Sequence, residues 1–151
     1  MKILMVCLGN ICRSPLAEGI LKDMIKKNNL NWTVDSAGTG SWHVGDSPDP
    51  RSVAVASTHG LDITLQRGRQ IKPADLENYD LIFAMDSSNY QNILQLSSSE
   101  ILHKKVQLIM NMDQPGMNQN VPDPYYGDDG FEGVYQMLKL ACNAIVEKYA
   151  N

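Results

Sequence analysis

Two side chains near the N-terminus, Cys7 and Arg13, are of the types that react with and bind a phosphate ester, and five residues separate them. A cysteine thiolate is a strong nucleophile, and a nearby cation or helix N-terminus favours this ionised form. The planar guanidinium of arginine binds two phosphate oxygens at once. The pair therefore predicts attack by the Cys7 sulfur on a phosphorus atom that Arg13 helps to hold.

The residues between Cys7 and Arg13 are predicted to form a cradle of backbone amides around the phosphate. They are Leu8, Gly9, Asn10, Ile11 and Cys12, and we call residues 7–13 the phosphate-binding loop. A loop that runs from a strand end to a helix start aims successive N–H groups at one point. Gly9 and Asn10 tolerate the left-handed backbone conformation that such a curl requires. The hydroxyl of Ser14 can hydrogen-bond to the thiolate.

The spacing alone is weak evidence, because a cysteine and an arginine at this separation often occur by chance. Cys7 would then be a buried strand residue and Arg13 a surface cation. The flanking sequence favours the phosphate site, since an apolar stretch at Lys2–Cys7 precedes the loop and Ser14-Pro15, a helix start, follows it.

Other uses of the loop fit the sequence poorly. A nucleotide-binding P-loop needs a Gly-Lys-Ser or Gly-Lys-Thr sequence, which does not follow the loop. A zinc site needs a second pair of ligands beside Cys7 and Cys12, and His43, His59 and His103 are scattered. We therefore expect neither a metal nor another cofactor.

Asp123 is the predicted proton donor to the leaving group. Pro122 and Pro124 flank it and favour an extended, stiff backbone that can hold the carboxyl group over a pocket. Asp-Pro is also a common turn sequence, and the local sequence alone favours that simpler interpretation. Three loop aromatics can flank an aromatic substrate ring: Trp42, Tyr125 and Tyr126. For Trp42, partial burial under its own loop is an equal alternative.

The elements that position these residues alternate between strand and helix. Strands are predicted at residues 2–7, 32–36, 79–85 and 105–110, and helices from Ser14, from Asp49-Pro50 to Gly60, at 86–96 and from near Asp129. A long connection spans residues 111–126. The pattern predicts an α/β fold with a four-stranded parallel sheet, helices on both faces and the phosphate-binding loop after strand 1. Sites form beyond the carboxyl ends of parallel strands, so Cys7 and Asp86 should share one rim.

The composition is that of one ordinary globular domain spanning residues 1–151, with 43% hydrophobic and 20% charged residues. A net charge of −4 argues against nucleic acid or an anionic membrane as a partner. No apolar run approaches the roughly 18 residues of a membrane span. Cys7, Cys12 and Cys142 cannot build a disulfide framework, which predicts reduced thiols and a cytoplasmic protein.

Four segments of the chain resemble the low-molecular-weight protein tyrosine phosphatases. They are VCLGNICRSP at 6–15, DSAGT at 35–39, AMD at 84–86 and PDPYYG at 122–127. The resemblance implies hydrolysis of phosphotyrosine and small aryl phosphate monoesters through a phosphocysteine on Cys7. Arg13 would bind the phosphate, and Asp123 would act first as the acid and then as the base that activates water. Phosphotyrosine-containing proteins are the implied substrates of a monomer or weak dimer, and no metal is implied.

The resemblance also implies supporting roles. Ser14 would be the thiolate partner, Ser36 would hold Asn10 in its strained conformation, and Trp42, Tyr125 and Tyr126 would form walls that tune substrate choice. Cys12 would either form a reversible disulfide with Cys7, making the enzyme redox-sensitive, or merely pack beneath the loop. Many relatives have a histidine near position 66. In those relatives the histidine supports the loop asparagine. Gln66 can hydrogen-bond but cannot titrate near neutral pH, so we do not transfer that role to it. His43 and His59 are expected to be cap or surface residues.

Three alternatives stay open. An arsenate reductase would need further cysteines to relay a disulfide, yet Cys142 is expected to lie in the core. A non-catalytic phosphate-binding module would not need Cys7, Arg13 and Asp123 together. Phosphorylation at Tyr125 or Tyr126 is a weaker hypothesis, based on their loop position and the acidic residues Asp128 and Asp129.

Overall fold

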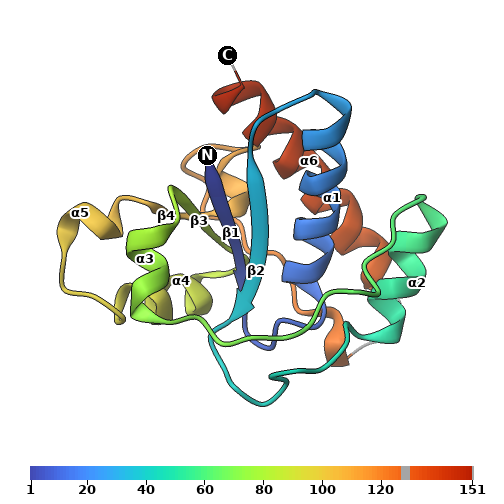
Figure 1. Ribbon diagram of the computed structural model, residues 1–151, viewed down its shortest axis with the longest axis horizontal. Helices are drawn as coiled ribbons and strands as arrows, with labels where there is room; N and C mark the ends of the chain where they lie inside the picture. Colours follow the sequence, from blue (N-terminus) through green and yellow to red (C-terminus); the bar gives the residue numbers. More distant parts are fainter. Residues whose placement is uncertain (127–129, 151) are drawn as a thin grey trace.

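The computed structural model describes residues 1–126 and 130–150 and contains a four-stranded parallel sheet in the order β2-β1-β3-β4 (Figure 1). The strands are β1 (Lys2–Cys7), β2 (Thr33–Gly38), β3 (Leu81–Ala84) and β4 (Val106–Leu108). β1 lies in the interior of the sheet and pairs with both β2 and β3. The predicted fold class is confirmed.

The bounds of β1 are those predicted, and the boundaries predicted for the other three strands were wrong by one or two residues. The strands expected at 32–36, 79–85 and 105–110 have the bounds given above. β2 extends to Gly38 because this glycine lets the chain pass close to the phosphate-binding loop: a Cβ here would lie 2.8 Å from the Leu8 carbonyl oxygen. β3 begins later because Tyr79 is the C-cap of a preceding helix. β4 ends early because the chain turns into a 3-10 helix at Ile109–Asn111.

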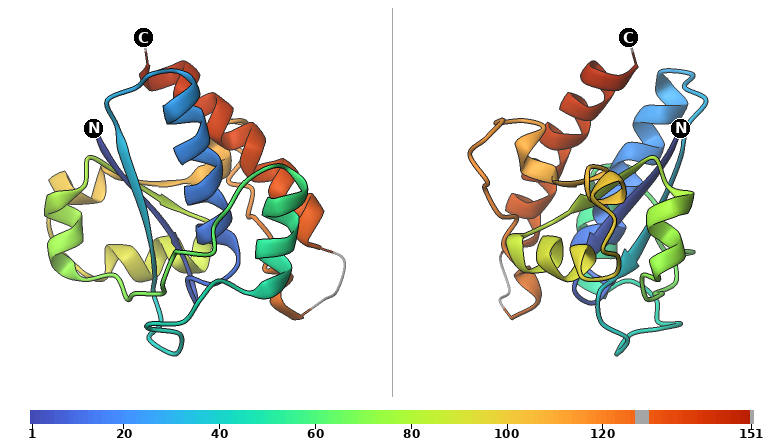
Figure 2. Two further views of the ribbon diagram at one scale, coloured as in Figure 1. Left: turned by 45° about the vertical axis from the view of Figure 1, so that its right-hand side comes forward. Right: turned by 90° about the vertical axis from the view of Figure 1, so that its left-hand side faces the viewer.

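Helices cover both faces of the sheet (Figures 1 and 2). One face carries α1 (Arg13–Lys27), α2 (Pro50–Thr58) and α6 (Phe131–Tyr149), and the other carries α3 (Pro73–Asn78), α4 (Ser87–Leu94) and α5 (Glu100–His103). Asp49 and Asp86 cap α2 and α4 through their side chains. The predicted start of the last helix near Asp129 lies outside the described residues. The short helices α3 and α5 were not predicted, and a second 3-10 helix, Pro124–Tyr126, interrupts the long connection.

The residues of β1 are buried on both faces of the sheet. Ile3, Met5 and Cys7 belong to the cluster under α1, α2 and α6, and Leu4 and Val6 belong to the cluster on the opposite face. Burial on both faces explains why the strand reads as a continuous apolar run rather than an alternating one. The nucleophile predicted from the sequence is therefore the last residue of the most enclosed strand.

The carboxyl ends of β1 and β3 lie at the rim opposite both chain termini (Figure 1). At this rim β1 leads through the phosphate-binding loop into α1, and β3 leads to Asp86. The long α1 and α6 pack against each other and against the sheet, which fixes the start of α1 relative to the strand ends. Within the described residues, no helix has both the length and the apolar character needed to cross a membrane.

Candidate active site

Asn10 gives the phosphate-binding loop its curled shape. Its φ of 59° lies in the left-handed region, and both ends of its side chain are hydrogen-bonded. Nδ2 donates to Ser14 Oγ at 2.8 Å and to Ser36 Oγ at 2.9 Å, while Oδ1 accepts from the Arg69 backbone N–H at 3.0 Å. These contacts hold a conformation that would otherwise cost about 1–2 kcal/mol. The structure thus places Ser36 against Asn10, where the resemblance expects it.

The sulfur of Cys7 lies inside this loop and has two hydrogen-bond partners. Cys7 Sγ is 3.0 Å from Ser14 Oγ and accepts from the Asn10 backbone N–H at 3.3 Å. Ser14 Oγ already accepts from Asn10 Nδ2, so its own hydrogen is available to the sulfur. Ser36 in turn donates to the buried Glu18 carboxylate at 2.7 Å. The network therefore presents hydrogen-bond donors to the sulfur.

Replacing Asn10 with alanine should disrupt both the loop and catalysis. We expect the free energy of unfolding to fall by about 3 kcal/mol, because the strained φ is kept while the buried groups lose their partner. kcat/KM for 4-nitrophenyl phosphate should fall at least about tenfold. Asn29→Ala is the matched control, because the exposed Asn29 has a φ of 52°. For Asn29→Ala, the free energy of unfolding measured by chemical denaturation should fall by about 1 kcal/mol. Its kcat/KM should not change. Equal losses in both variants would contradict this account of the loop.

Arg13 is almost fully buried, with 2% of its surface exposed, and its guanidinium is held between the two neighbouring rim segments. Nη1 donates to Asp86 Oδ2 at 2.7 Å and to the Val121 carbonyl at 2.9 Å. Nη2 lies 3.6 Å from Asp123 Oδ2. Asp86 thus meets Arg13 at the rim, as the positions of the strand ends predict, and these contacts fix the orientation of the guanidinium.

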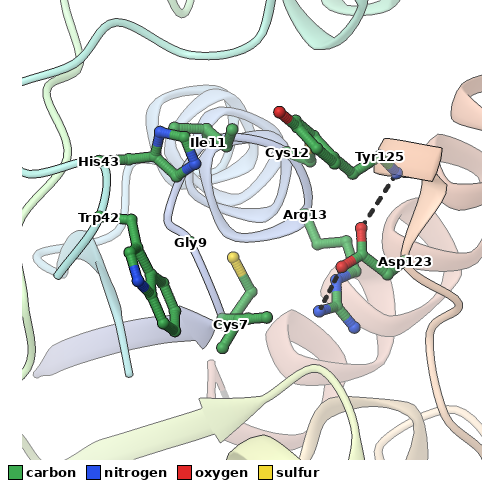
Figure 3. Close-up of a pocket in the computed structure, with 10 residues that line it drawn as sticks. Cys7, Gly9, Ile11, Cys12, Arg13, Trp42, His43, Asp123 and Tyr125 are labelled. Carbon is green, nitrogen blue, oxygen red and sulfur yellow. Dashed lines mark hydrogen bonds and ion pairs between the residues drawn. The ribbon is translucent and has the colours of Figure 1, made fainter. Parts of the chain in front are cut away.

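A cavity of about 300 Å³ opens above the loop (Figure 3). Its lining residues are Cys7, Leu8, Gly9, Ile11, Cys12, Arg13, Trp42, His43, Asp123 and Tyr125. Asp123 lies beside Arg13 in the wall of this cavity, and its other oxygen, Oδ1, accepts the Tyr125 backbone N–H at 3.0 Å. The structure therefore brings together the thiol, the guanidinium and the carboxyl group that the sequence singles out.

The walls of the cavity include a residue that the sequence analysis missed. Trp42 is 73% exposed, so it is not buried beneath its loop, and Tyr125 lies on another part of the wall. His43 was expected at the surface or in a cap, but it lines the cavity beside Gly9 and bonds to Asp46 through Nδ1 at 3.0 Å. Its position next to Trp42 in the sequence was the signal that could have placed His43 in the cavity wall. Tyr126 belongs to the 3-10 helix, and its side chain is outside what the structure describes.

Gln66 takes a structural role beside the loop. Its Nε2 donates to the Pro15 carbonyl of α1 at 3.1 Å, while Asn10 is supported from this segment by the Arg69 backbone. His59 joins α2 to α6 by stacking on Tyr135 and bonding to Glu132 at 2.8 Å, which fits the expected surface role. Among residues 1–126 and 130–150, no group of three or more histidine, cysteine or acidic side chains is placed to hold a metal ion.

The three cysteines should differ in reactivity. Burial, followed by the negative charges of Asp49, Cys7 and Asp123, raises the pKa of Cys12 to about 12, and burial raises the pKa of Cys142 to about 12. Below these values both remain thiols, whereas the thiolate is the reactive form. We expect iodoacetamide at neutral pH to modify Cys7 alone, as read by peptide mass spectrometry. Inorganic phosphate should protect Cys7, and faster modification of Cys12 would contradict the assignment.

The fold and the site define a class: an α/β protein whose first parallel strand ends in a thiol within a curled loop, with an arginine and an aspartate beside it. Residues 2–151 match the family model described as low molecular weight phosphotyrosine protein phosphatase. The chain belongs to this family and is a protein-tyrosine phosphatase.

Individual relatives agree over almost the whole chain. The low molecular weight phosphotyrosine protein phosphatase of Schizosaccharomyces pombe is 44% identical over 91% of this chain and 89% of its own. A protein tyrosine phosphatase structure from Entamoeba histolytica superimposes with a TM-score of 0.93 at 38% identity, covering 99% of this chain and 97% of that one. The Drosophila arginine phosphatase structure has a TM-score of 0.92 at 38% identity, covering 100% and 99%.

Proposed function

We propose that this protein hydrolyses phosphotyrosine, and small aryl phosphate monoesters, through a phosphocysteine intermediate on Cys7. The observation that carries the proposal is the placement of the Cys7 sulfur, which faces the Ser14 hydroxyl and the Asn10 amide at one end of the cavity. Arg13 and Asp123 line the same cavity. A nucleophile, an anion clamp and a proton donor are the three requirements of this reaction.

The reaction proceeds in two displacements at phosphorus. The Cys7 thiolate attacks, a sulfur–phosphorus bond forms, and the bond from phosphorus to the phenol oxygen breaks as the Asp123 carboxyl group gives that oxygen its proton. A water molecule then attacks the phosphocysteine, and the Asp123 carboxylate accepts the proton of that water. Inorganic phosphate leaves and the thiolate is restored. Arg13 and the amides of residues 8–13 stabilise the charge on the phosphate oxygens in both steps.

Trp42 and Tyr125 are the proposed contacts of the substrate ring, because both line the cavity and both are exposed. From the resemblance to the family alone, we propose Tyr126 as a third residue of this wall. We also propose that residues 1–151 act as one phosphatase domain on phosphotyrosine proteins, as a monomer or weak dimer. The three free cysteines support a cytoplasmic location.

Redox sensitivity is a further part of the proposed function. A peroxide would oxidise the Cys7 thiolate to a sulfenic acid, and the Cys12 sulfur would displace water from it to give a disulfide. Cys12 and Cys7 both line the cavity, which supports this pairing. The raised pKa of Cys12 slows the second step, because its attacking thiolate is scarce.

A trapping experiment tests the proposal. The protein is mixed with a phosphotyrosine peptide, quenched in acid within milliseconds, digested and analysed by mass spectrometry. In the quenched samples we expect phosphate on the peptide that contains Cys7. In samples that are not quenched we expect release of inorganic phosphate. Phosphoserine and phosphoarginine peptides of the same sequence serve as comparators, since one structural neighbour is named an arginine phosphatase. Turnover without phosphate on Cys7 would reject the mechanism, and faster turnover of a comparator would reject the substrate.

A further inference from the structure

Arg51, in the first turn of α2, contacts the segment that carries the proposed acid. Its Nη2 donates to the Tyr125 carbonyl at 3.0 Å, and its guanidinium carbon lies 5.6 Å from the centroid of the Tyr125 ring. The same guanidinium lies 4.7 Å from the centroid of the buried Phe131 ring, at the start of α6. Arg51 thereby joins α2 to the 3-10 helix Pro124–Tyr126 and to α6.

The guanidinium of Arg51 is itself held in place by Asp49. Nε donates to Asp49 Oδ1 at 3.0 Å and Nη2 donates to Oδ2 at 2.9 Å, so the contact is bidentate. Asp49 is buried, and the hydrogen bond from the Arg51 side chain is the main cause that lowers its carboxyl pKa below the usual value. A planar fork fixed at two points loses little freedom when it binds a third group.

The start of α2 is in turn fixed to the phosphate-binding loop. The Asp49 backbone N–H donates to the Ile11 carbonyl at 2.8 Å, and the Ser52 hydroxyl donates to the Cys12 carbonyl at 3.3 Å. Arg51 therefore extends from a turn attached to the loop of the nucleophile and reaches the segment of the acid. The start of α2 therefore fixes the loop that carries Cys7 and the segment that carries Asp123 relative to each other.

Tyr125 connects Arg51 to the acid. Its backbone N–H donates to Asp123 Oδ1 at 3.0 Å, and its carbonyl accepts from Arg51. With Oδ1 engaged in this way, Oδ2 is the oxygen that faces Arg13, at 3.6 Å. We propose that Arg51 is a positioning residue that holds the Asp123 carboxyl group over the cavity for proton transfer. This proposal rests on the acid role of Asp123 in the proposed function.

The test compares two substrates that differ in their need for a proton. Phenolate is a much stronger base than 4-nitrophenolate, so phenyl phosphate depends more on a well-placed acid. We expect Arg51→Gln to lower kcat/KM about tenfold for phenyl phosphate and less than about threefold for 4-nitrophenyl phosphate. Arg67→Gln is the matched control, because Arg67 is exposed and donates to the Thr64 and Gln66 carbonyls of its own loop. It should change neither value.

A double variant identifies the group through which Arg51 acts. In an Asp123→Asn background, Arg51→Gln should cause no further selective loss with phenyl phosphate. Equal losses on both substrates, or a full additional loss in the double variant, would overturn the proposal. If Arg51→Gln does not fold in thermal unfolding, Arg51→Lys replaces it, because it keeps the charge but lacks the fork. A smaller selective loss is then expected, and an unselective one overturns the proposal.

The same measurements separate the proposal from the function on which it rests. If Asp123→Asn shows the selective loss and neither Arg51 variant does, the positioning role alone fails. If Asp123→Asn shows no preference between the two esters, the acid role and its positioning residue are both rejected.

Discussion

Replacing Cys7 with serine is expected to lower kcat/KM for 4-nitrophenyl phosphate by at least about 10⁴-fold. A serine hydroxyl is much less acidic than a thiol, and the groups around position 7 are donors that stabilise an anion rather than bases that would remove a proton. Ser14 and the Asn10 amide supply these donors. Initial rates measured over a range of substrate concentrations give the value.

Phosphate binding separates loss of the nucleophile from loss of the site. Arg13 and the loop amides remain in Cys7→Ser, so isothermal titration with inorganic phosphate should show binding within about threefold of the unaltered protein. Cys142→Ala is the control for a cysteine outside the site, because Cys142 lies on the buried face of α6, in the core. It should keep its activity. Substantial turnover by Cys7→Ser would exclude the covalent mechanism.

Replacing Asp123 with asparagine should produce the second-largest effect. General-acid catalysis is typically worth 10²–10⁴-fold, and we expect a loss of about that size in kcat/KM for phenyl phosphate. The loss for 4-nitrophenyl phosphate should be smaller, because its leaving group departs without a full proton. Asparagine has nearly the same shape and can still accept the Tyr125 N–H, which limits structural side effects.

A plot of log kcat/KM against the leaving-group basicity of several aryl phosphates tests this prediction. The slope should be steeper for Asp123→Asn than for the unaltered protein. Asp46→Asn provides a matched control, since Asp46 is an exposed aspartate that binds His43 at the edge of the cavity. It should leave the slope unchanged. Parallel lines for Asp123→Asn would show that another group protonates the leaving oxygen.

The main architecture followed from the sequence because the strongest signals were long or repeated. The continuous apolar run of β1 and the alternation of strands and helices predicted the parallel sheet, and capping residues such as Asp49 and Asp86 located two helix starts. The missed helices α3 and α5 have six and four residues, too few to show a helical period. Strand ends shifted where tertiary contacts, such as the close approach at Gly38, decided the boundary.

The site was predictable where its residues lie close in sequence or at strand ends. Residues 7–14 are contiguous, and Asp86 follows a strand that ends at the same rim. Ser36 came only from the family resemblance, because no local pattern indicates that it binds Asn10. His43 and Arg51 were not identified, since their contacts with Gly9 and Tyr125 depend on how distant loops pack. Long-range contacts of this kind leave no periodic pattern in one sequence.

The enclosed position of β1 divides the site into parts of unequal local stability. The sulfur and the guanidinium are buried with the sheet and α1, so we expect their backbone to be released only when the sheet and α1 come apart together. The carboxyl group of Asp123 is carried by an exposed residue whose segment is joined to that unit through the buried Val121 and through Arg51. As denaturant is added, the first function that the enzyme loses should thus be the protonation of the leaving group by Asp123. The enzyme would pass through a state that still captures anions and alkylating reagents but turns over poorly.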